Sequence, residues 1–396
     1  MNKLLEVALS LVLSSCVVLP TLHLALRPSP ARYLRTNDAP PEMARELAVS
    51  QVAAWNAGQR DVARQVNPEW DLGHHTFFAL GLTNLALDAA PDVRETYRAE
   101  VDAVIAEVRA RPQQHFHLGY FKGTFEDRRG RSLFLDGEVL LMLAARLAVW
   151  PDPARHTDLG ALAKVVVDQM AAGPVLMGES YPNECWTFDN TLALAALTVT
   201  AHVLGHPVGG AEALTRRWLA SAARLTDAHT GLLVASTTWD GATLDGPEGS
   251  SAFAVAHFLE LVDAKLAREQ YERAKEQLVV RPLGFAYAHE WPDAAQWGKD
   301  PLPARAGTPD VDSGPVIPFV HAGAGASGMA VLGAAAFHDD ALLAELVTSM
   351  ELTAFPERKN GALRFRATNS LGDAVLLYAM AQGPLWRLIR AGKATS

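Results

Sequence analysis

The chain has 396 residues, of which 49% are hydrophobic and 20% are charged, and its formal net charge is −9. This composition allows a large buried core and excludes a disordered chain. No stretch concentrates enough lysine and arginine to follow a phosphate backbone, so we expect no nucleic-acid partner. The two cysteines, Cys16 and Cys185, give no disulfide framework, because Cys16 lies in the N-terminal segment.

Residues 1–40 differ in composition from the rest of the chain. An apolar run covers residues 7–26, and a linker rich in proline and arginine follows it. Such a run fits the apolar core of a signal peptide or a short membrane anchor. We therefore expect membrane association through residues 7–26, or export to the periplasm or the cell exterior. Because the run shares neither period nor pattern with the remaining chain, we expect residues 1–35 not to pack against the body.

The charges around the apolar run leave the side of the membrane open. Lys3 before the run is offset by Glu6, whereas Arg27, Arg32 and Arg35 follow it. By the positive-inside rule, these three arginines would keep the body in the cytoplasm, which disagrees with simple export.

Residues 41–396 are expected to form one domain, in which two kinds of helix alternate. Amphipathic helices, which should face water, are expected at about 41–57, 91–110, 155–172, 209–226, 262–279 and 339–353. Helices that are apolar nearly all round, which should be buried, are expected at about 74–88, 134–150, 188–204, 250–261, 315–337 and 369–383. The fifth boundary is the weakest, because residues 250–279 also fit one long helix.

The starts of the apolar helices recur at a nearly regular spacing of about 60 residues, which indicates a repeat architecture. These starts are marked by His74, Asp136, Asp189, Ser250, Ser313 and Ser370. An open array of repeats needs polar caps at its ends, and the last apolar helix has no polar face, so a closed ring is favoured. The predicted fold is all-α: an (α/α)6 toroid with inner and outer rings of six helices each.

A polar patch precedes each apolar helix, and in a toroid the six patches would lie on one rim around a central funnel. Some patches have a purely structural explanation, because Ser250 and Ser370 are ordinary N-cap residues. Capping does not need His74, Glu138 or Glu184. These three residues therefore carry more weight for function.

The richest patch covers residues 179–190, where carboxylates and aromatic side chains are crowded at the start of an apolar helix. Such a crowd at the mouth of a buried helix is typical of a pocket floor. Taken singly, Thr187 or Asp189 can be a helix cap, and the aromatic residues can fill gaps in the core. Taken together, they predict a pocket.

We expect carboxyl groups facing one another across this pocket to carry the chemistry. The expected catalytic residues are Glu184, Asp189, Glu138 and Asp312. The expected substrate-binding residues are His74, Trp70, Tyr181, Trp186, Cys185, Asp136 and His321. Few basic residues lie in the patches, so the carboxyls should share protons and at least one should have a raised pKa.

No motif in the chain indicates a metal or a cofactor, and we expect neither. The histidines form no HExxH pattern, and no Cys/His pairing has the spacing of a zinc site. A glycine-rich phosphate loop is also missing, since the small residues at 322–328 belong to an apolar helix. Nucleophilic catalysis by a Ser/His/Asp set stays open, although no nucleophile elbow is present.

The order of these blocks resembles the (α/α)6-toroid enzymes, which include many glycoside hydrolases and polysaccharide lyases, and most closely the linalool dehydratase/isomerase family. Residues 70–74, Trp-Asp-Leu-Gly-His, are similar to a Trp-acidic-Leu-x-His stretch of that family. Residues 135–142 are similar to its segment with a catalytic His, and residues 180–190 to its segment with two active-site Cys. The resemblance implies the fold and the position of the pocket.

The residues that carry the chemistry of that family are not kept. Glu138 stands where its His is expected, Ser180 and Asp189 stand near the positions of its two Cys, and Cys185 falls between them. The resemblance therefore does not imply hydration and dehydration of a terpene alcohol here.

We expect an acid/base enzyme that acts on a neutral, sugar-like small molecule, with glycoside hydrolysis as the leading reaction. One carboxyl would donate a proton to the leaving oxygen while another activates water. A lyase or isomerase acting on an apolar alcohol is the first alternative, and it would need a funnel lined by aliphatic residues. A non-catalytic binding toroid is the second, and its rim carboxylates would all pair with arginine or cap helices. The sequence leaves the oligomeric state open.

Overall fold

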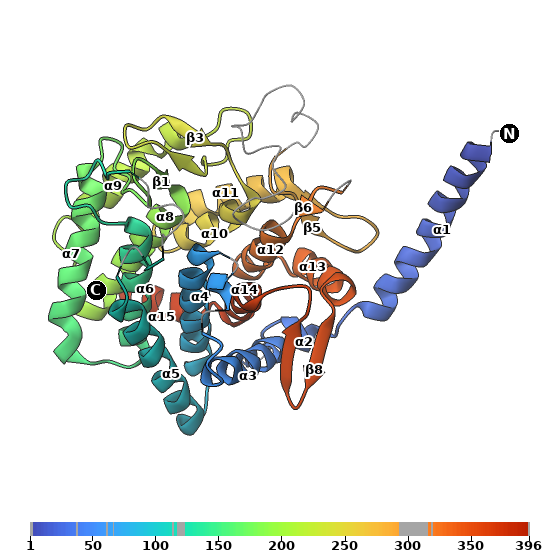
Figure 1. Cartoon of the computed structure of the whole chain (residues 1–396), viewed down its shortest axis with the longest axis horizontal. Helices are drawn as coiled ribbons and strands as arrows, with labels where there is room; N and C mark the ends of the chain where they lie inside the picture. The colour runs from blue at the N-terminus through green and yellow to red at the C-terminus, as the bar shows by residue number, and fades with distance from the viewer. Residues whose placement is uncertain are drawn as a thin grey trace.

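Six apolar helices form a closed inner ring (Figure 1). The structure is a computed structural model that describes residues 3–36, 39–60, 62–65, 67–112, 115–116, 123–292, 316–317 and 320–394. The ring consists of α4 (Pro68–Ala86), α6 (Leu133–Val149), α8 (Thr187–Leu204), α10 (Gly249–Leu259), α12 (Ala324–Ala336) and α14 (Ser370–Ala381). Each helix contacts the next in this order, and α14 packs back against α4. Their side chains are mostly buried, as expected for helices without a polar face.

The amphipathic helices form an outer ring around the inner one. They are α3 (Glu42–Asn56), α5 (Pro91–Ala110), α7 (His156–Ala172), α9 (Ala211–Ser221), α11 (Ala264–Leu278) and α13 (Asp340–Thr353). Helix α5 contacts α4 and α6, α7 contacts α6 and α8, and α11, α13 and α3 contact α10, α12 and α14. The chain is therefore an all-α toroid of the (α/α)6 class, and the expected alternation of helices is confirmed.

Side-chain caps set the beginnings of several helices. The Asn67 and Asn369 side chains accept hydrogen bonds of 2.9 Å from backbone N–H groups at the starts of α4 and α14. Asp263 accepts one of 2.9 Å from Leu266, so residues 250–279 form two helices rather than one. Helix α4 begins six residues earlier than expected, because Asn67 and the following Pro68 start it before His74.

Short strands occupy the connections that lead into the inner helices. β1 (Cys185–Trp186), β2 (Ser236–Thr237) and β3 (Thr243–Asp245) form an antiparallel sheet, and β1 runs directly into α8. The antiparallel pairs are β4 (Val279–Val280) with β5 (Tyr287–Ala288), β6 (Val316–Ile317) with β7 (Ala322–Gly323), and β8 (Pro356–Lys359) with β9 (Ala362–Phe365). Short 3-10 helices cover Ala63–Gln65, Pro153–Arg155 and Ala222–Leu225. Because β6 and β7 take up residues expected to be helical, α12 begins at 324 rather than 315.

The inner ring closes tightly where its first and last helices meet. A side chain at Gly81 of α4 would place its Cβ 2.7 Å from Leu377 of α14, so only glycine allows this approach. Helix α15 (Pro384–Ala394) follows and contacts α4, α6 and α8. Trp386 of α15 stacks on His257 with 5.2 Å between the ring centroids. Helix α15 therefore fills the end of the ring at which the inner helices finish.

Helix α1 (Lys3–Leu26) extends away from the body and has no buried residue (Figure 1). The linker after it, which includes α2 (Pro30–Tyr33), does pack against the toroid, so the expectation that residues 1–35 stay apart is wrong for this part. Tyr33 is 3% exposed, and Arg32 forms ion pairs with two glutamates of α3. Arg35 bonds the Ala381 carbonyl at 3.1 Å. These contacts depend on single polar and aromatic side chains, which the apolar pattern could not reveal.

Candidate functional site

Two buried carboxyl groups, Glu138 and Asp189, lie where the N-terminal parts of α4, α6 and α8 meet. Thr76 of α4 donates a hydrogen bond of 2.7 Å to Glu138 Oε2. The Ser180 hydroxyl donates to Asp189 Oδ2 in the first turn of α8. Glu138 is 1% exposed and Asp189 is 5% exposed. Neither forms an ion pair with a lysine, arginine or histidine of the described residues. Together with Glu184 and Tyr181, these residues form what we call the acid cluster.

Burial changes the protonation of both carboxyls. It raises the pKa of Glu138 well above its ordinary value; the hydrogen bond from Thr76 opposes this rise, and the Asp189 carboxylate adds to it. Burial likewise raises the pKa of Asp189 to about 7, against the hydrogen bond from Ser180 and with a further rise caused by Glu184. Both shifts favour the protonated carboxyl, and with a pKa of about 7 Asp189 is present in both its protonated and its ionised form near neutral pH.

Tyr181 and Trp186 connect this pair to two further carboxyls. The Tyr181 hydroxyl donates to the Glu69 carboxylate in the first turn of α4. The Trp186 indole donates a hydrogen bond of 2.6 Å to Glu184 Oε1. Burial raises the pKa of the Tyr181 hydroxyl well above its ordinary value, and Glu69 adds to this rise, so the hydroxyl stays a donor. The structure thus brings together the expected residues Glu184, Asp189, Glu138, Tyr181 and Trp186.

Asp136, in contrast, is not part of the acid cluster. Its carboxylate is held by the Arg131 guanidinium at 2.8 Å and by the Gln169 amide of α7, also at 2.8 Å. Glu179 from the same sequence patch accepts hydrogen bonds from the backbone N–H groups of Glu126 and Asp127, at 3.0 and 2.8 Å. Asp136 is therefore paired with a cation and Glu179 is held by backbone donors, as expected for structural groups.

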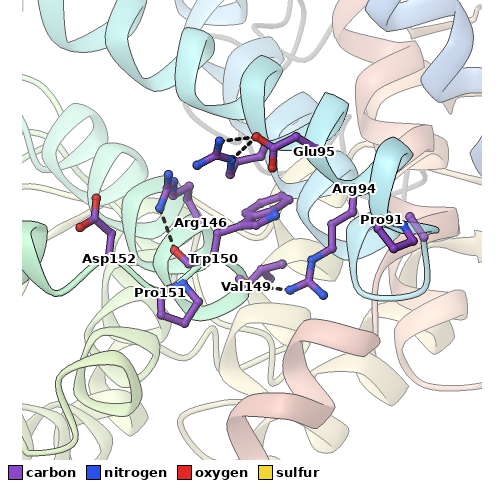
Figure 2. Close-up of a pocket in the computed structure, with 10 residues that line it drawn as sticks. Pro91, Arg94, Glu95, Arg146, Val149, Trp150, Pro151 and Asp152 are labelled. Carbon is purple, nitrogen blue, oxygen red and sulfur yellow. Dashed lines mark hydrogen bonds and ion pairs between the residues drawn. The ribbon is translucent and has the colours of Figure 1, made fainter.

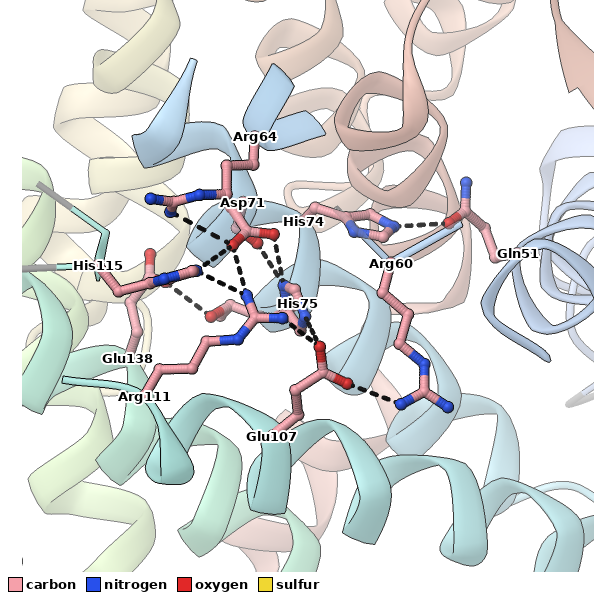
Figure 3. A network of polar contacts seen from close by, with 11 residues as sticks. Gln51, Arg60, Arg64, Asp71, His74, His75, Glu107, Arg111, His115 and Glu138 are labelled. Atoms are coloured by element: carbon pink, nitrogen blue, oxygen red, sulfur yellow. Dashed lines mark hydrogen bonds and ion pairs between the residues drawn. The ribbon is translucent and has the colours of Figure 1, made fainter. Parts of the chain in front are cut away.

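A buried ion-pair network fastens the start of α4 to the end of α5 (Figure 3). Asp71 accepts a hydrogen bond of 2.7 Å from Arg111, and its carboxylate lies 3.5 Å from His75 and 3.6 Å from His115. Glu107 of α5 pairs with the same Arg111. Because the opposite charges in this network face one another, we interpret it as a support that holds α4 in position.

His74 does not supply a positive charge to the acid cluster. Its Nε2 lies 2.9 Å from the Gln51 side-chain oxygen in α3, and its ring stacks on Phe78 (Figure 3). Burial lowers the pKa of His74 to about 3, and His75 lowers it further. The imidazole is therefore neutral at physiological pH and points toward α3.

The other expected substrate-binding residues lie at different places. Cys185 is buried in β1, and burial raises the pKa of its thiol, with added effects of the nearby carboxylates. His321 lies beside His289 near the start of α12, with 6.3 Å between the rings. Trp70 lies in the first turn of α4, and Asp312 falls outside the described residues.

Other carboxyls stand at the starts of the remaining inner helices. Glu290 accepts a hydrogen bond of 3.1 Å from the Ser250 backbone at the start of α10, and also a bond from the Ser250 hydroxyl. Asp373 of α14 accepts one of 2.7 Å from Thr368, and burial raises its pKa to about 6. Asp373 lies in the polar patch expected before α14, whereas Glu290 comes from the loop after β5 and belongs to none of the six expected patches.

Several residues of the site could not be recognised from the sequence. Thr76 and Ser180 hold the two central carboxyls, yet threonine and serine are too common to be recognised by pattern. Glu69 stands in the first turn of a helix, where an acidic residue is ordinary. In the described part of the chain, no group of His, Cys, Asp and Glu side chains has the arrangement of a metal site.

A pocket of about 590 Å³ lies at the end of the ring where α6 finishes and α5 begins (Figure 2). Arg94, Arg98 and Arg146 line it. Arg146 pairs with Asp102 at 2.8 Å, and Arg94 donates 2.7 Å to the Val149 carbonyl. No candidate site residue lines this pocket, so its size does not make it part of the acid cluster.

Comparison with known proteins adds only distant likenesses. No family model matches the chain, and no curated protein matches it. It is similar to a possible member of the GH105 family from Salmonella enterica at 15% identity, with a TM-score of 0.47, over 79% of this chain and 82% of that chain. It is also similar to a polysaccharide lyase at 14% identity, with a TM-score of 0.46, over 81% of this chain and 90% of that chain. The toroid is therefore established by the helix contacts described above.

Proposed function

We propose that the chain is an acid/base enzyme that hydrolyses a glycosidic bond in a neutral, sugar-like substrate, with the acid cluster as its catalytic site. The observation that carries this proposal is the pair of buried carboxyls, Glu138 and Asp189, held by hydroxyl groups and without a cationic partner among the described residues. A purely structural carboxylate is normally neutralised, as Asp136 is. Two neighbouring carboxyls whose pKa values are both raised by burial are suited to acid/base work.

The different pKa values assign the two roles. Glu138, whose pKa is raised the more strongly by burial, donates its proton to the glycosidic oxygen as the bond from that oxygen to the anomeric carbon breaks. Asp189 in its ionised form takes a proton from the water molecule whose oxygen attacks the anomeric carbon. Proton exchange with solvent then restores both groups. Glu184 adds to the rise that burial causes in the pKa of Asp189, and Tyr181 and Trp186 would offer aromatic faces to a sugar ring.

Three observations favour this reaction over the alternatives. Hydroxyl groups of Thr76 and Ser180 hold the two carboxyls and that of Tyr181 holds Glu69, whereas a linalool dehydratase-like site for an apolar alcohol would need an aliphatic lining. That chemistry would also need a reactive thiol, but Cys185 is buried and its thiol pKa is raised. A non-catalytic toroid would pair all its rim carboxylates, and Glu138 and Asp189 have no such partner within the described residues.

We also propose that α1 anchors the protein in a membrane. Helix α1 has 24 residues, its most apolar window of 18 residues has a mean hydropathy of 2.0, and none of that window is buried. At about 1.5 Å per residue it reaches roughly 36 Å, which exceeds the hydrocarbon thickness of about 30 Å. The linker behind it is bonded to α3 and to the end of α14, so the anchor is joined firmly to the body.

The enzymatic proposal is tested with the full chain in detergent and a panel of neutral oligosaccharides and aryl glycosides. Wild type should release reducing ends that carry heavy oxygen from labelled water, whereas an eliminating lyase would give an unsaturated product without label. Glu138→Gln and Asp189→Asn should each lower turnover by about a hundredfold or more. Asp136→Asn is the matched control, because this buried carboxyl lies on the same helix but is ion-paired, and turnover per folded molecule should persist. Equal losses in all three variants would contradict the assignment.

A further inference from the structure

Two bulky apolar residues stand exposed at loop tips in a strained backbone conformation. Leu283 has φ 51° and is 46% exposed, and Phe355 has φ 51° and is 64% exposed. Residues other than glycine avoid this left-handed region, because the Cβ atom crowds the backbone. An apolar side chain in water contributes no burial energy to the fold. Contacts within the folded chain therefore do not account for the strained backbone and the exposure of these two residues.

The two tips lie beside the same part of α13. In the loop that carries Leu283, the Ala286 backbone donates a hydrogen bond of 2.9 Å to Ser349 Oγ, and Arg281 bonds Glu345 at 2.6 Å. Ser349 belongs to the C-terminal half of α13, which ends at Thr353, and Glu345 lies about one turn before Ser349. Phe355 follows that end directly.

Helix α1 leaves the body at this same place. The His23 ring lies 5.8 Å from the Phe285 ring in an edge-on arrangement, and a Cβ at Gly284 would lie 2.6 Å from His23 Nδ1. Helix α1 also contacts α13. Figure 1 shows α1 departing from the side of the body that carries α13 and the β8–β9 hairpin. The base of the apolar helix therefore lies against the loop that carries Leu283, and Phe355 follows the end of α13, which α1 also contacts.

We propose that Leu283 and Phe355 dip into the surface of the bilayer that holds α1, so that the body lies on the membrane in one fixed orientation. This inference rests on the proposed anchoring by α1. A single membrane helix would leave the body free to change its orientation relative to the bilayer. Three points of insertion, namely α1, Leu283 and Phe355, would fix that orientation. Apolar loop residues gain free energy when they leave water for the acyl region, which accounts for their exposure.

The orientation has a consequence for the mouth of the ring. The loop that carries Leu283 continues through β5 to Glu290, whose carboxylate holds Ser250 at the start of α10. The membrane contact therefore lies only a few residues away from the polar rim.

The test uses the full chain in phosphatidylcholine vesicles with and without nitroxide-labelled lipid. Single cysteines carry an environment-sensitive dye in a Cys16→Ser background, in which Cys185 is buried. The variants are Leu283→Cys, Phe355→Cys, Val12→Cys within α1, and Val93→Cys. Val93 is the matched control, because it is 39% exposed and apolar but lies in α5, away from α1 (Figure 1).

Nitroxide lipid should quench the dye at positions 12, 283 and 355 at least threefold more than at position 93. If position 12 itself is not quenched, the anchoring proposal fails and this inference with it. If position 12 is quenched while 283 or 355 behaves like 93, the anchor stands and the fixed contact is overturned.

Discussion

Thr76 of α4 donates a hydrogen bond of 2.7 Å to Glu138 of α6, and in the described part of the chain this is the one hydrogen bond that the Glu138 carboxyl receives. A neutral hydroxyl stabilises a carboxylate less than a cation does. Burial therefore prevails over the hydrogen bond, and the pKa of Glu138 rises. The contact positions the carboxyl without ionising it, which is what a proton donor needs.

Glu138→Gln should lower turnover by about a hundredfold or more and should not lower stability at neutral pH. A carboxyl whose pKa is raised by folding contributes stability below its unfolded pKa, and this contribution is lost as the pH rises through the folded pKa. Glutamine cannot ionise, so the variant should gain stability relative to wild type as pH rises. Urea unfolding at several pH values measures this. A variant clearly less stable at pH 8 would show that Glu138 is a structural group.

Asp189→Asn tests the second carboxyl through its pH window. The pKa of Asp189 is about 7 in the folded chain against an ordinary 3.8, so wild type should lose stability between about pH 4 and pH 7. At about 1.36 kcal/mol per pKa unit, the loss is on the order of 4 kcal/mol. Asparagine retains an acceptor for the Ser180 hydroxyl but cannot ionise. The unfolding free energy of the variant should therefore change less between about pH 4 and pH 7 than that of wild type. Parallel curves for the two proteins would contradict the raised pKa.

Asp136→Asn should behave in the opposite way. Its carboxylate is buried between Arg131 and Gln169, so removal of the charge weakens bonds that the fold uses. We expect a loss of about 1–3 kcal/mol in unfolding free energy. Turnover per folded molecule should remain. Arg131→Ala should show a similar loss in chemical denaturation, because it breaks the same pair.

Cys185 should be inert in the folded protein. It is buried, and burial raises the pKa of its thiol, so little thiolate exists to react. In a Cys16→Ser variant, titration with a thiol reagent at pH 8 should detect no thiol before denaturation and one afterwards. Rapid labelling of the native protein would instead point to cysteine chemistry and would reopen the linalool dehydratase-like alternative.

Tyr33→Ala should destabilise the protein by about 3 kcal/mol, because the side chain is 3% exposed between the linker and the toroid. Leu11→Ala in α1 is the control, since Leu11 is 64% exposed and contributes nothing to the core. Thermal unfolding in detergent compares the two. Equal midpoints would mean that the linker does not support the fold.

The alternation of helices could be predicted because buried helices and surface helices differ clearly in their content of apolar and charged residues. The segment expected at 91–110 forms α5 (Pro91–Ala110), and the one expected at 188–204 forms α8 (Thr187–Leu204). A helix buried on all sides must be apolar all round, and its outer partner must keep a charged face. Six such pairs leave closure as the natural way to cover the last apolar helix.

The direction of individual side chains could not be predicted in this way. Asp136 and Glu138 lie two residues apart in α6, which corresponds to a rotation of about 200° around the helix axis. Their side chains therefore leave α6 on nearly opposite faces. Asp136 therefore meets Gln169 of α7, while Glu138 meets Thr76 of α4. Which of the two faces the ring centre depends on the rotation of α6, and the apolar pattern constrains this weakly when every face is buried.

Closure of the ring also means that α4 cannot complete its packing until the C-terminal helices have been synthesised. Asn84 of α4 accepts a hydrogen bond of 3.1 Å from Leu385, which lies 301 residues further along the chain. At roughly 5–20 residues per second, α4 waits on the order of 15–60 s for that partner to emerge from the ribosome. Throughout this interval the growing chain is an open arc, and the apolar face around Gly81 lacks its cover. We therefore expect a chaperone to bind the exposed apolar face of α4 until α14 and α15 have been synthesised and cover it.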